Sequence, residues 1–328
     1  MCTEDTERDN DDALDKPGTV DRRHFGYMSA ASIFAASFGT TACSVNEKSG
    51  GSTAGTDEAS PSTEASGAET SVAPGTPIIE QSVNISMAGA EGEAAGVSDS
   101  LFIHPVDGTY PGILIWPDIL GLRPAFEAMG KRLAMAGYAV LVVNPFWRDA
   151  PAPVVAPGEQ FSNPDVRARV IPMARKLTQP AAFADARDYI SFLDGQDAVD
   201  TDRMIGTAGY CMGGPLIMRT AGAVPDRVGA AASFHGGGLV TDRDDSPHLL
   251  IPQTRAQVLH AVAENDYERN PDFKPVLEKA YADAGLAAEI EVYAGTLHGW
   301  CPPDSRVYNE AQAEKAWSRL LALYERAL

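Results

Sequence analysis

The feature that most constrains this chain is a cysteine enclosed by glycines, in the sequence Gly209-Tyr210-Cys211-Met212-Gly213-Gly214. A strand-like run (203–208) precedes it and a helix-like run (215–221) follows it. A G-x-C-x-G at such a junction has the form of a nucleophile elbow, whose tight turn only glycine tolerates cheaply. The alternative is a buried cysteine beside packing glycines, because free cysteine is often a core residue. The glycines on both sides and the preceding strand favour the elbow.

Strand-like and helix-like segments alternate from residue 78 to residue 328, which predicts one α/β domain with a mostly parallel central sheet and helices on both faces. The first two strands, 78–87 and 101–104, are expected to pair at one edge. Further strands are expected at 112–116, 138–143, 228–234, 257–263 and 287–293, and helices at 123–136, 181–193, 270–284 and 306–327. The Pro-rich segment 146–179 is expected to be a long irregular loop, which is typical of lids and binding loops.

The first 43 residues resemble an export signal. Arg22-Arg23 precede a mildly apolar run that ends in small residues before Cys43, as in a twin-arginine signal with a bacterial lipoprotein processing site. Thr40 departs from that pattern, in which an aliphatic residue is usual. The apolar run is too short for a permanent membrane anchor. The alternative is a disordered arm with a chance Arg-Arg pair, in a cytoplasmic protein.

Residues 44–77 consist mainly of Ser, Thr, Gly, Ala, Glu and Pro. Such a composition buries too little apolar surface to offset the entropy of ordering, so it predicts a disordered linker. Together with lipidation at Cys43, the linker predicts an exported domain on the outer face of the bacterial cytoplasmic membrane, or a secreted one. A lipid anchor would be its membrane contact.

The formal net charge of −19 makes nucleic acid an unsuitable partner, because phosphates are neutralised by Lys and Arg. The four cysteines are too scattered for a disulfide framework or a Cys-x-x-Cys metal site. They are Cys2, Cys43, Cys211 and Cys301.

Three chemically active residue types follow apolar strands in the order Cys211, Asp266, His298. Nucleophile, acid, histidine is the order of an α/β-hydrolase triad, and the carboxyl ends of parallel strands bring such groups together. His298 would take the thiol proton, and Asp266 would orient the imidazole. Glu264 is the rival acid, and Asp266 could instead be a turn residue. His235 could line the pocket, whereas His260 lies mid-strand and is expected to be packed.

A second group of residues comes from the loop Trp116-Pro117-Asp118-Ile119-Leu120-Gly121, which follows a predicted central strand. In α/β-hydrolases this loop supplies one oxyanion N–H, and the residue after the nucleophile supplies the other. The sequence therefore predicts an oxyanion hole made by the backbone N–H groups of Ile119 and Met212.

The elbow, together with 111–121, 234–238, Asp266 and His298-Gly299, resembles the dienelactone hydrolase family over about residues 97–328. The resemblance implies a monomeric α/β-hydrolase with a Cys211-His298-Asp266 triad. It implies hydrolysis of a small-molecule ester or lactone without a metal or organic cofactor. Trp116, Asp118, His235 and Trp300 are expected to line the substrate pocket.

Two positions depart from the family. Asp118 stands where characterised members have a Glu that helps to activate the thiol, and Pro302 stands where they have an Arg that binds the substrate carboxylate. The second departure argues against dienelactone itself as the substrate. Arg148 and Arg306 are alternative anion contacts, although a solvated surface role is favoured for both.

Cys301 lies three residues after His298 and could therefore approach Cys211 in space. A disulfide between the two cysteines is a further hypothesis, and it would silence the nucleophile in an oxidising compartment. The competing functional interpretation is a lipid-tethered binding protein that uses the hydrolase scaffold without turnover. A redox or metal site built from Cys211, Cys301 and His298 lacks a suitable spacing motif.

Overall fold

The structure is a computed structural model that describes residues 8, 10, 11, 13, 14 and 76–328. All of these belong to one compact unit comprising Met1–Lys16 and Thr70–Leu328. The Arg22-Arg23 pair, the apolar run, Cys43 and the linker up to residue 75 lie outside the described residues.

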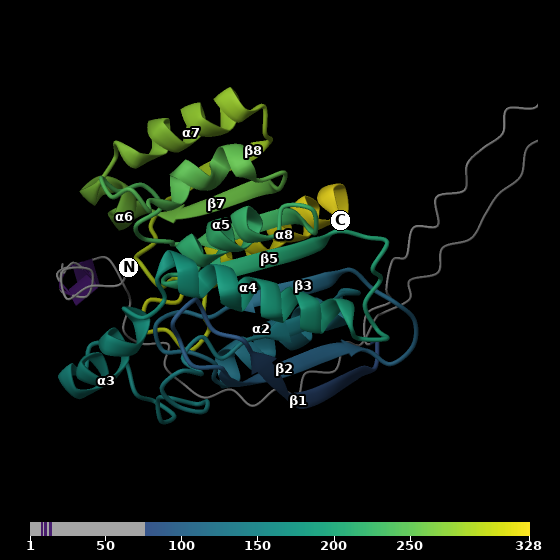
Figure 1. Ribbon diagram of the computed structural model, residues 1–328. Coiled ribbons are helices and arrows are strands. Elements are labelled where there is room, and N and C mark those ends of the chain that lie inside the picture. Colours follow the sequence, from purple (N-terminus) through teal and green to yellow (C-terminus); the bar gives the residue numbers. More distant parts are fainter. Residues whose placement is uncertain (1–7, 9, 12, 15–75) are drawn as a thin grey trace, which may run out of the picture. The chain divides into compact units, whose positions relative to one another are not determined.

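An eight-stranded sheet with the strand order β1-β2-β4-β3-β5-β6-β7-β8 forms the centre of the domain (Figure 1). Strand β2 runs antiparallel to β1 and to β4, and every other pairing is parallel. The predicted mostly parallel sheet and its edge hairpin are therefore confirmed. The strands are β1 (Ile78–Met87), β2 (Gly96–Pro105), β3 (Gly112–Trp116), β4 (Ala139–Val142), β5 (Ile205–Tyr210), β6 (Val228–Phe234), β7 (Gln257–Ala263) and β8 (Ala288–Tyr293).

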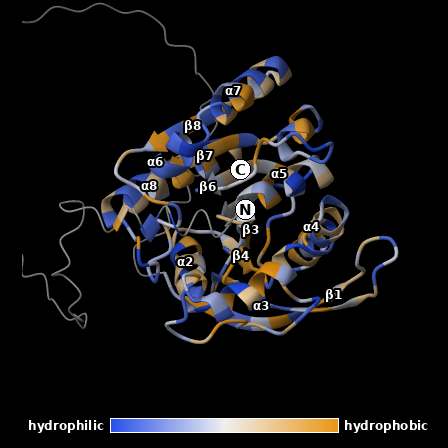
Figure 2. Ribbon diagram, turned by 90° about the vertical axis from the view of Figure 1, so that its left-hand side faces the viewer, coloured by the Kyte–Doolittle hydropathy of each residue, from blue (hydrophilic) through white to orange (hydrophobic). Residues whose placement is uncertain are grey.

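Helices cover both faces of the sheet, and each face has its own cluster of buried apolar residues. Helices α4, α5 and α7 contribute to one cluster, and α2 and α8 contribute to the other (Figures 1 and 2). The helices are α2 (Pro124–Met135), α3 (Pro164–Ala174), α4 (Gln179–Asp194), α5 (Gly213–Ala223), α6 (Glu264–Arg269), α7 (Phe273–Ala284) and α8 (Glu310–Ala327), with a 3₁₀ turn at Pro247–Gln253. None of the helices in the described part of the chain is both long and apolar enough to cross a bilayer.

Small residues in the central strands let α8 approach the sheet closely. A Cβ atom on Gly206 of β5 would lie 2.8 Å from the Tyr324 ring, and one on Gly229 of β6 would lie 2.5 Å from the carbonyl oxygen of Ala327. The amphipathic pattern of α8 is thus matched by glycines on the strands that it covers.

The segment 146–179 is more ordered than predicted, because it contains α3 and the start of α4. Asn163 caps α3 by accepting a hydrogen bond from the Asp165 N–H at 2.9 Å. Thr178 caps α4 through its hydroxyl, which accepts from the Ala181 N–H at 3.4 Å. Both caps are followed by a proline in the first turn, a position where proline's missing N–H costs nothing.

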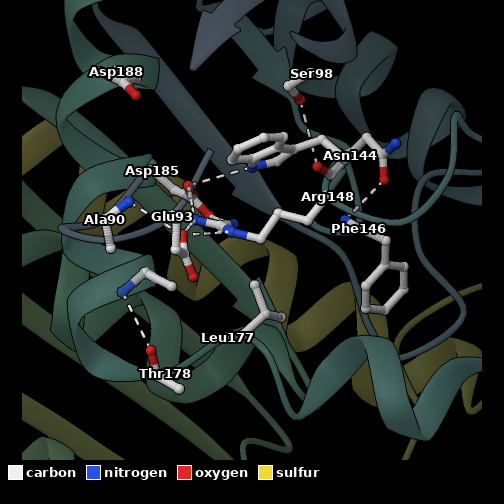
Figure 3. A network of polar contacts seen from close by, with 12 residues as sticks. Ala90, Glu93, Ser98, Asn144, Phe146, Arg148, Leu177, Thr178, Asp185 and Asp188 are labelled. Atoms are coloured by element: carbon white, nitrogen blue, oxygen red, sulfur yellow. Dashed lines mark hydrogen bonds and ion pairs between the residues drawn. The ribbon is translucent and has the colours of Figure 1, made fainter. Parts of the chain in front are cut away.

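Charged and amide side chains fix the start of this segment to the sheet and to α4 (Figure 3). Arg148, whose side chain is 10% exposed, pairs with the fully buried Asp185 at 2.8 Å and with Glu93 at 2.8 Å. Asn144 accepts a hydrogen bond from the Phe146 N–H at 2.9 Å. Arg148 therefore has a structural role rather than the anion-binding or solvated role expected from the sequence.

Candidate active site

A tight strand-to-helix turn forms where the sequence predicts a nucleophile elbow. Cys211 follows β5 directly, has the left-handed φ of 51°, and is 2% exposed. Its N–H donates to the carbonyl oxygen of Phe234 at 3.0 Å. A Cβ atom on Gly209 would lie 2.1 Å from the carbonyl oxygen of Gly213, so the turn requires glycine at 209. The strain at Cys211 is maintained by this close packing.

Asp266 and His298 come together from the ends of neighbouring strands. The short helix α6, which begins directly after β7, carries Asp266, and the loop after β8 carries His298. The Oδ2 atom of Asp266 lies 2.6 Å from Nδ1 of His298. Glu264, the rival acid, instead accepts a hydrogen bond from the Gly295 N–H at 3.0 Å. Asp266 is thus the acid that contacts the histidine.

The imidazole of His298 lies between a carboxylate and a thiol. Burial alone would lower its pKa, but the Asp266 carboxylate and the hydrogen-bonded Cys211 sulfur outweigh burial and raise the pKa of His298 to about 10. An imidazole held in this way is charged at neutral pH, which places a positive charge beside the Cys211 sulfur.

The predicted oxyanion donors lie on two backbone segments that touch. Strands β3 and β5 pair with Trp116 opposite Gly209, and a Cβ atom on Gly213 would lie 2.3 Å from the carbonyl oxygen of Trp116. Neither the N–H of Ile119 nor that of Met212 donates to another residue within the described ranges. Two available N–H groups therefore lie on adjoining turns beside Cys211.

A cavity opens over Cys211 and His298. Its walls combine apolar side chains with two guanidinium groups, those of Arg123 and Arg306. The other lining residues are Asn10, Asp118, Ile119, Leu120, Gln160, Phe161, Gly299, Ser305 and Val307. The cavity therefore has both apolar and charged walls, a combination typical of small-molecule sites.

Asp118 lines this cavity, but its carboxylate is held by Arg123. Arg123 donates to both oxygens of Asp118, at 2.7 and 2.9 Å, and to both oxygens of Asp304, at 2.9 and 2.7 Å. Burial would lower the pKa of Arg123, but the two carboxylates outweigh burial and raise it, so the guanidinium stays charged. Sequence reasoning missed Arg123 and Asp304. The sequence does hold one signal for Arg123, because an arginine stands at the start of α2, shortly after the loop 116–121.

The two tryptophans expected in the pocket are in the core instead. Trp116 is fully buried and donates through its indole N–H to the Thr220 hydroxyl at 3.0 Å. Trp300 is also fully buried and stacks on Tyr293 with ring centroids 4.8 Å apart. Trp116 is the last residue of β3, and Trp300 lies in the loop after β8. Burial removes the large apolar area of both side chains from water.

The two other histidines singled out in the sequence differ in their relation to the site. His235 is 1% exposed, and its ring packs edge-on against His298 with centroids 5.2 Å apart. It does not line the cavity over Cys211. His260 is packed, as expected, with Nε2 2.9 Å from the Tyr281 hydroxyl, and burial lowers its pKa to about 3.

Cys301 is buried on the opposite face of the sheet from Cys211. The two residues belong to different apolar clusters, and both remain thiols rather than forming a disulfide. Burial raises the pKa of the Cys301 thiol well above its ordinary value, which keeps it protonated and unreactive. The disulfide hypothesis is therefore wrong for this structure, although only three residues separate Cys301 from His298.

Comparison with known proteins agrees with this architecture. The profile of the dienelactone hydrolase family matches residues 99–328. A carboxymethylenebutenolidase of Rhodococcus opacus is 25% identical over 233 residues, covering 69% of this chain and 86% of that protein. Protein usf of Aquifex pyrophilus is 22% identical over 223 residues, covering 66% of this chain and 89% of that protein.

Solved structures show the same fold. A Klebsiella pneumoniae structure assigned to the dienelactone hydrolases has a TM-score of 0.63 at 22% identity, covering 76% of this chain and 99% of that one. The family match spans most of the chain and includes every strand end that carries the site. The chain therefore belongs to the dienelactone hydrolase family of lactone and ester hydrolases.

Proposed function

We propose that this chain hydrolyses a small ester or lactone with Cys211 as nucleophile, His298 as base and Asp266 as the orienting acid. The observation that carries the proposal is the His298 ring, which contacts Asp266 at 2.6 Å on one side and is hydrogen-bonded to the Cys211 sulfur on the other. This arrangement supplies an activated nucleophile and a proton carrier in one unit.

The reaction proceeds in two halves. The Cys211 thiolate attacks the substrate carbonyl carbon, and the N–H groups of Ile119 and Met212 stabilise the oxyanion of the tetrahedral intermediate. The C–O bond breaks, the departing alkoxide takes a proton from the His298 imidazolium, and a thioester on Cys211 remains. A water then gives a proton to His298 and attacks the thioester. Collapse of this second intermediate releases the acid and returns the thiol.

The walls of the cavity limit the substrate. At the position where family members carry the carboxylate-binding Arg, this chain has the buried Pro302. Arg123 is already bonded to two carboxylates, so it is poorly placed to replace that Arg. A small ester or lactone other than dienelactone fits these constraints. Relatives named carboxymethylenebutenolidase support a lactone as the first substrate to test.

The test uses intact-mass detection with p-nitrophenyl acetate and a panel of small lactones. The wild-type chain should turn the substrate over and show an acyl adduct on Cys211, and Cys211→Ala should show neither. Turnover that survives in Cys211→Ala would remove the proposal. A chain that binds these compounds without any adduct or product would instead be the binding protein considered as the alternative.

We further propose that the chain is exported, with Arg22-Arg23 as the signal and Cys43 as the lipidated residue. The support is confined to the sequence pattern. Replacing both arginines by lysine should leave the precursor in the cytoplasm, and Cys43→Ser should release the domain from the membrane fraction. A wild-type chain found at full length in the cytoplasm would contradict both parts.

A further inference from the structure

A closed ring of hydrogen bonds lies in the cavity wall beside His298 and includes an asparagine from the N-terminal segment. The Oδ1 atom of Asn265 accepts from the backbone N–H of His298 at 2.9 Å. The Nδ2 atom of Asn265 donates to Oδ1 of Asn10 at 2.9 Å, and Nδ2 of Asn10 donates to the carbonyl oxygen of His298 at 2.9 Å. Every bond in the ring is of ordinary length.

This ring is selective for a carboxamide. Because the His298 N–H holds the oxygen of Asn265, the amide nitrogen of Asn265 is presented outward as a donor. The carbonyl oxygen of His298 is the matching acceptor. An occupant must therefore offer one acceptor and one donor about as far apart as the two ends of an amide. A carboxylate would place a second acceptor against the His298 carbonyl oxygen.

The same segment makes a second contact at the cavity. Asn10 is 4% exposed and lines the cavity together with Cys211. The next residue, Asp11, places Oδ1 2.7 Å from Nη1 of Arg306, another lining residue. This ion pair is partly exposed and contributes little by itself, but it joins a second residue of the same segment to the cavity wall.

We propose that the part of the cavity wall beside His298 is a subsite for a carboxamide followed by a carboxylate, and that Asn10-Asp11 occupies it as an internal competitor of the substrate for as long as the chain has not been cut ahead of Cys43. Competition rests on the proposed function, because it requires that the substrate binds in the cavity over Cys211. The subsite itself rests only on the contacts of Asn10 and Asp11. Substrate enters when Asn10-Asp11 leaves this subsite, and the rate of reaction at Cys211 is limited by how often the subsite is vacant.

The first experiment measures access to Cys211 in the full chain without using turnover. Asn10→Asp keeps the shape of the side chain but replaces the required donor by an acceptor. Alkylation of Cys211 by N-ethylmaleimide, resolved by peptide mass, should be about tenfold faster than in the wild type, the effect of losing one or two buried hydrogen bonds. Gln81→Glu, the same chemical change on the exposed edge strand β1, should leave the rate unchanged. Equal rates in Asn10→Asp and the wild type would overturn the proposal.

The second experiment restores the occupant from outside. An amidated synthetic peptide of residues 1–16 should slow alkylation of Cys211 in the Asn10→Asp chain, whereas the same peptide with aspartate at position 10 should not. No slowing by the asparagine peptide would also overturn the proposal. If the asparagine peptide protects Cys211 but no variant hydrolyses any ester or lactone, the subsite stands and the hydrolase proposal fails. If Asn10→Asp and the wild type both hydrolyse esters at the same rate and are alkylated at the same rate, the hydrolase proposal stands and the subsite proposal fails.

Discussion

The Nδ1 atom of His298 lies 2.6 Å from the Oδ2 atom of Asp266, and 32 positions of sequence separate the two residues. The His298 side chain is 4% exposed and that of Asp266 is 15% exposed. Such a contact between largely buried groups is strong, because little water competes for either partner. It orients the ring on which both halves of the proposed reaction depend.

Asp266→Asn should change how stability depends on pH. The folded-state pKa of His298, about 10, is above its ordinary value of 6.5, so the contact stabilises the fold fully below pH 6.5. That contribution is lost as the pH rises through about 10. The free energy of unfolding in urea should therefore fall between pH 6.5 and 10 in the wild type and fall less in Asp266→Asn. Parallel pH profiles would show that Asp266 does not raise the pKa.

The same substitution should reduce turnover by roughly three to four orders of magnitude, as when an amide replaces the orienting carboxylate of a serine triad. The Glu264→Gln variant is the control, because Glu264 contacts the Gly295 N–H rather than His298. Its kcat should stay within about threefold of the wild-type value, since it removes no charge from the reacting groups. A larger loss in Glu264→Gln than in Asp266→Asn would reassign the acid.

Arg123→Gln should destabilise the fold by about 3–5 kcal/mol, because it leaves the buried Asp118 carboxylate without its partner. Arg123 is 6% exposed and joins the loop after β3 to the loop after His298 through Asp118 and Asp304. The matched control is Arg255→Gln, whose partner Asp226 is 76% exposed, and it should cost less than about 0.5 kcal/mol. Urea unfolding of both variants measures the difference. Similar costs would mean that Arg123 contributes no more than a surface ion pair.

Gly213→Ala should lower kcat by about 100-fold, the effect of losing one oxyanion donor. A Cβ atom at this position would lie 2.3 Å from the carbonyl oxygen of Trp116, so the turn that carries Met212 must move away from the turn that carries Ile119. Gly195→Ala is a suitable control, because its nearest atoms are carbonyl oxygens at 3.5 Å and its φ of −87° suits alanine. Burst kinetics with an activated ester separate acylation from binding. An unchanged kcat in Gly213→Ala would mean that the close contact between the two turns is not needed for catalysis.

His235 should matter through its ring rather than through its nitrogens. Neither ring nitrogen bonds to another described residue, and burial, together with the neighbouring His298, holds the pKa of His235 well below its ordinary value. His235→Phe keeps a ring against His298, so we expect stability within about 1 kcal/mol of the wild type and retained turnover. His235→Ala opens a cavity, should cost about 3 kcal/mol, and should release the His298 ring. Equal losses of turnover in both variants would instead assign a role to the nitrogens.

The strand ends that carry the site could be predicted because buried strands have a strong local signal. Strand β3 consists of five buried residues that are apolar or glycine, and β7 is buried from its second residue onward. The predicted carboxyl ends of both strands agree with the structure. Strand β2 begins five residues earlier than predicted. Its first residues, Gly96-Val97-Ser98-Asp99-Ser100, have weak strand propensity, and pairing with β1 overrides it.

The contacts between distant loops could not be predicted. Arg123 and Asp304 are 181 positions apart, and Asn10 and Asn265 are 255 apart. Nothing in local periodicity or composition pairs them, since each is a polar residue in a stretch that would also suit a solvated loop. The burial of Trp116 and Trp300 could not be predicted for the same reason. Whether a residue near the end of a strand lines a pocket or lies in the core depends on which distant segments pack over it.

Because Asn10-Asp11 belongs to the same chain as the cavity, occupancy of the subsite depends on the chain between them being intact. While the chain from residue 15 to residue 75 is intact, the occupant is present at an effective concentration that can reach about millimolar for a tethered ligand, and dilution does not lower it. One cut anywhere in that stretch turns the occupant into an ordinary solute, which then escapes into the surrounding volume. Any proteolytic step that shortens this protein at its N-terminus would therefore also set how much of it is ready to react.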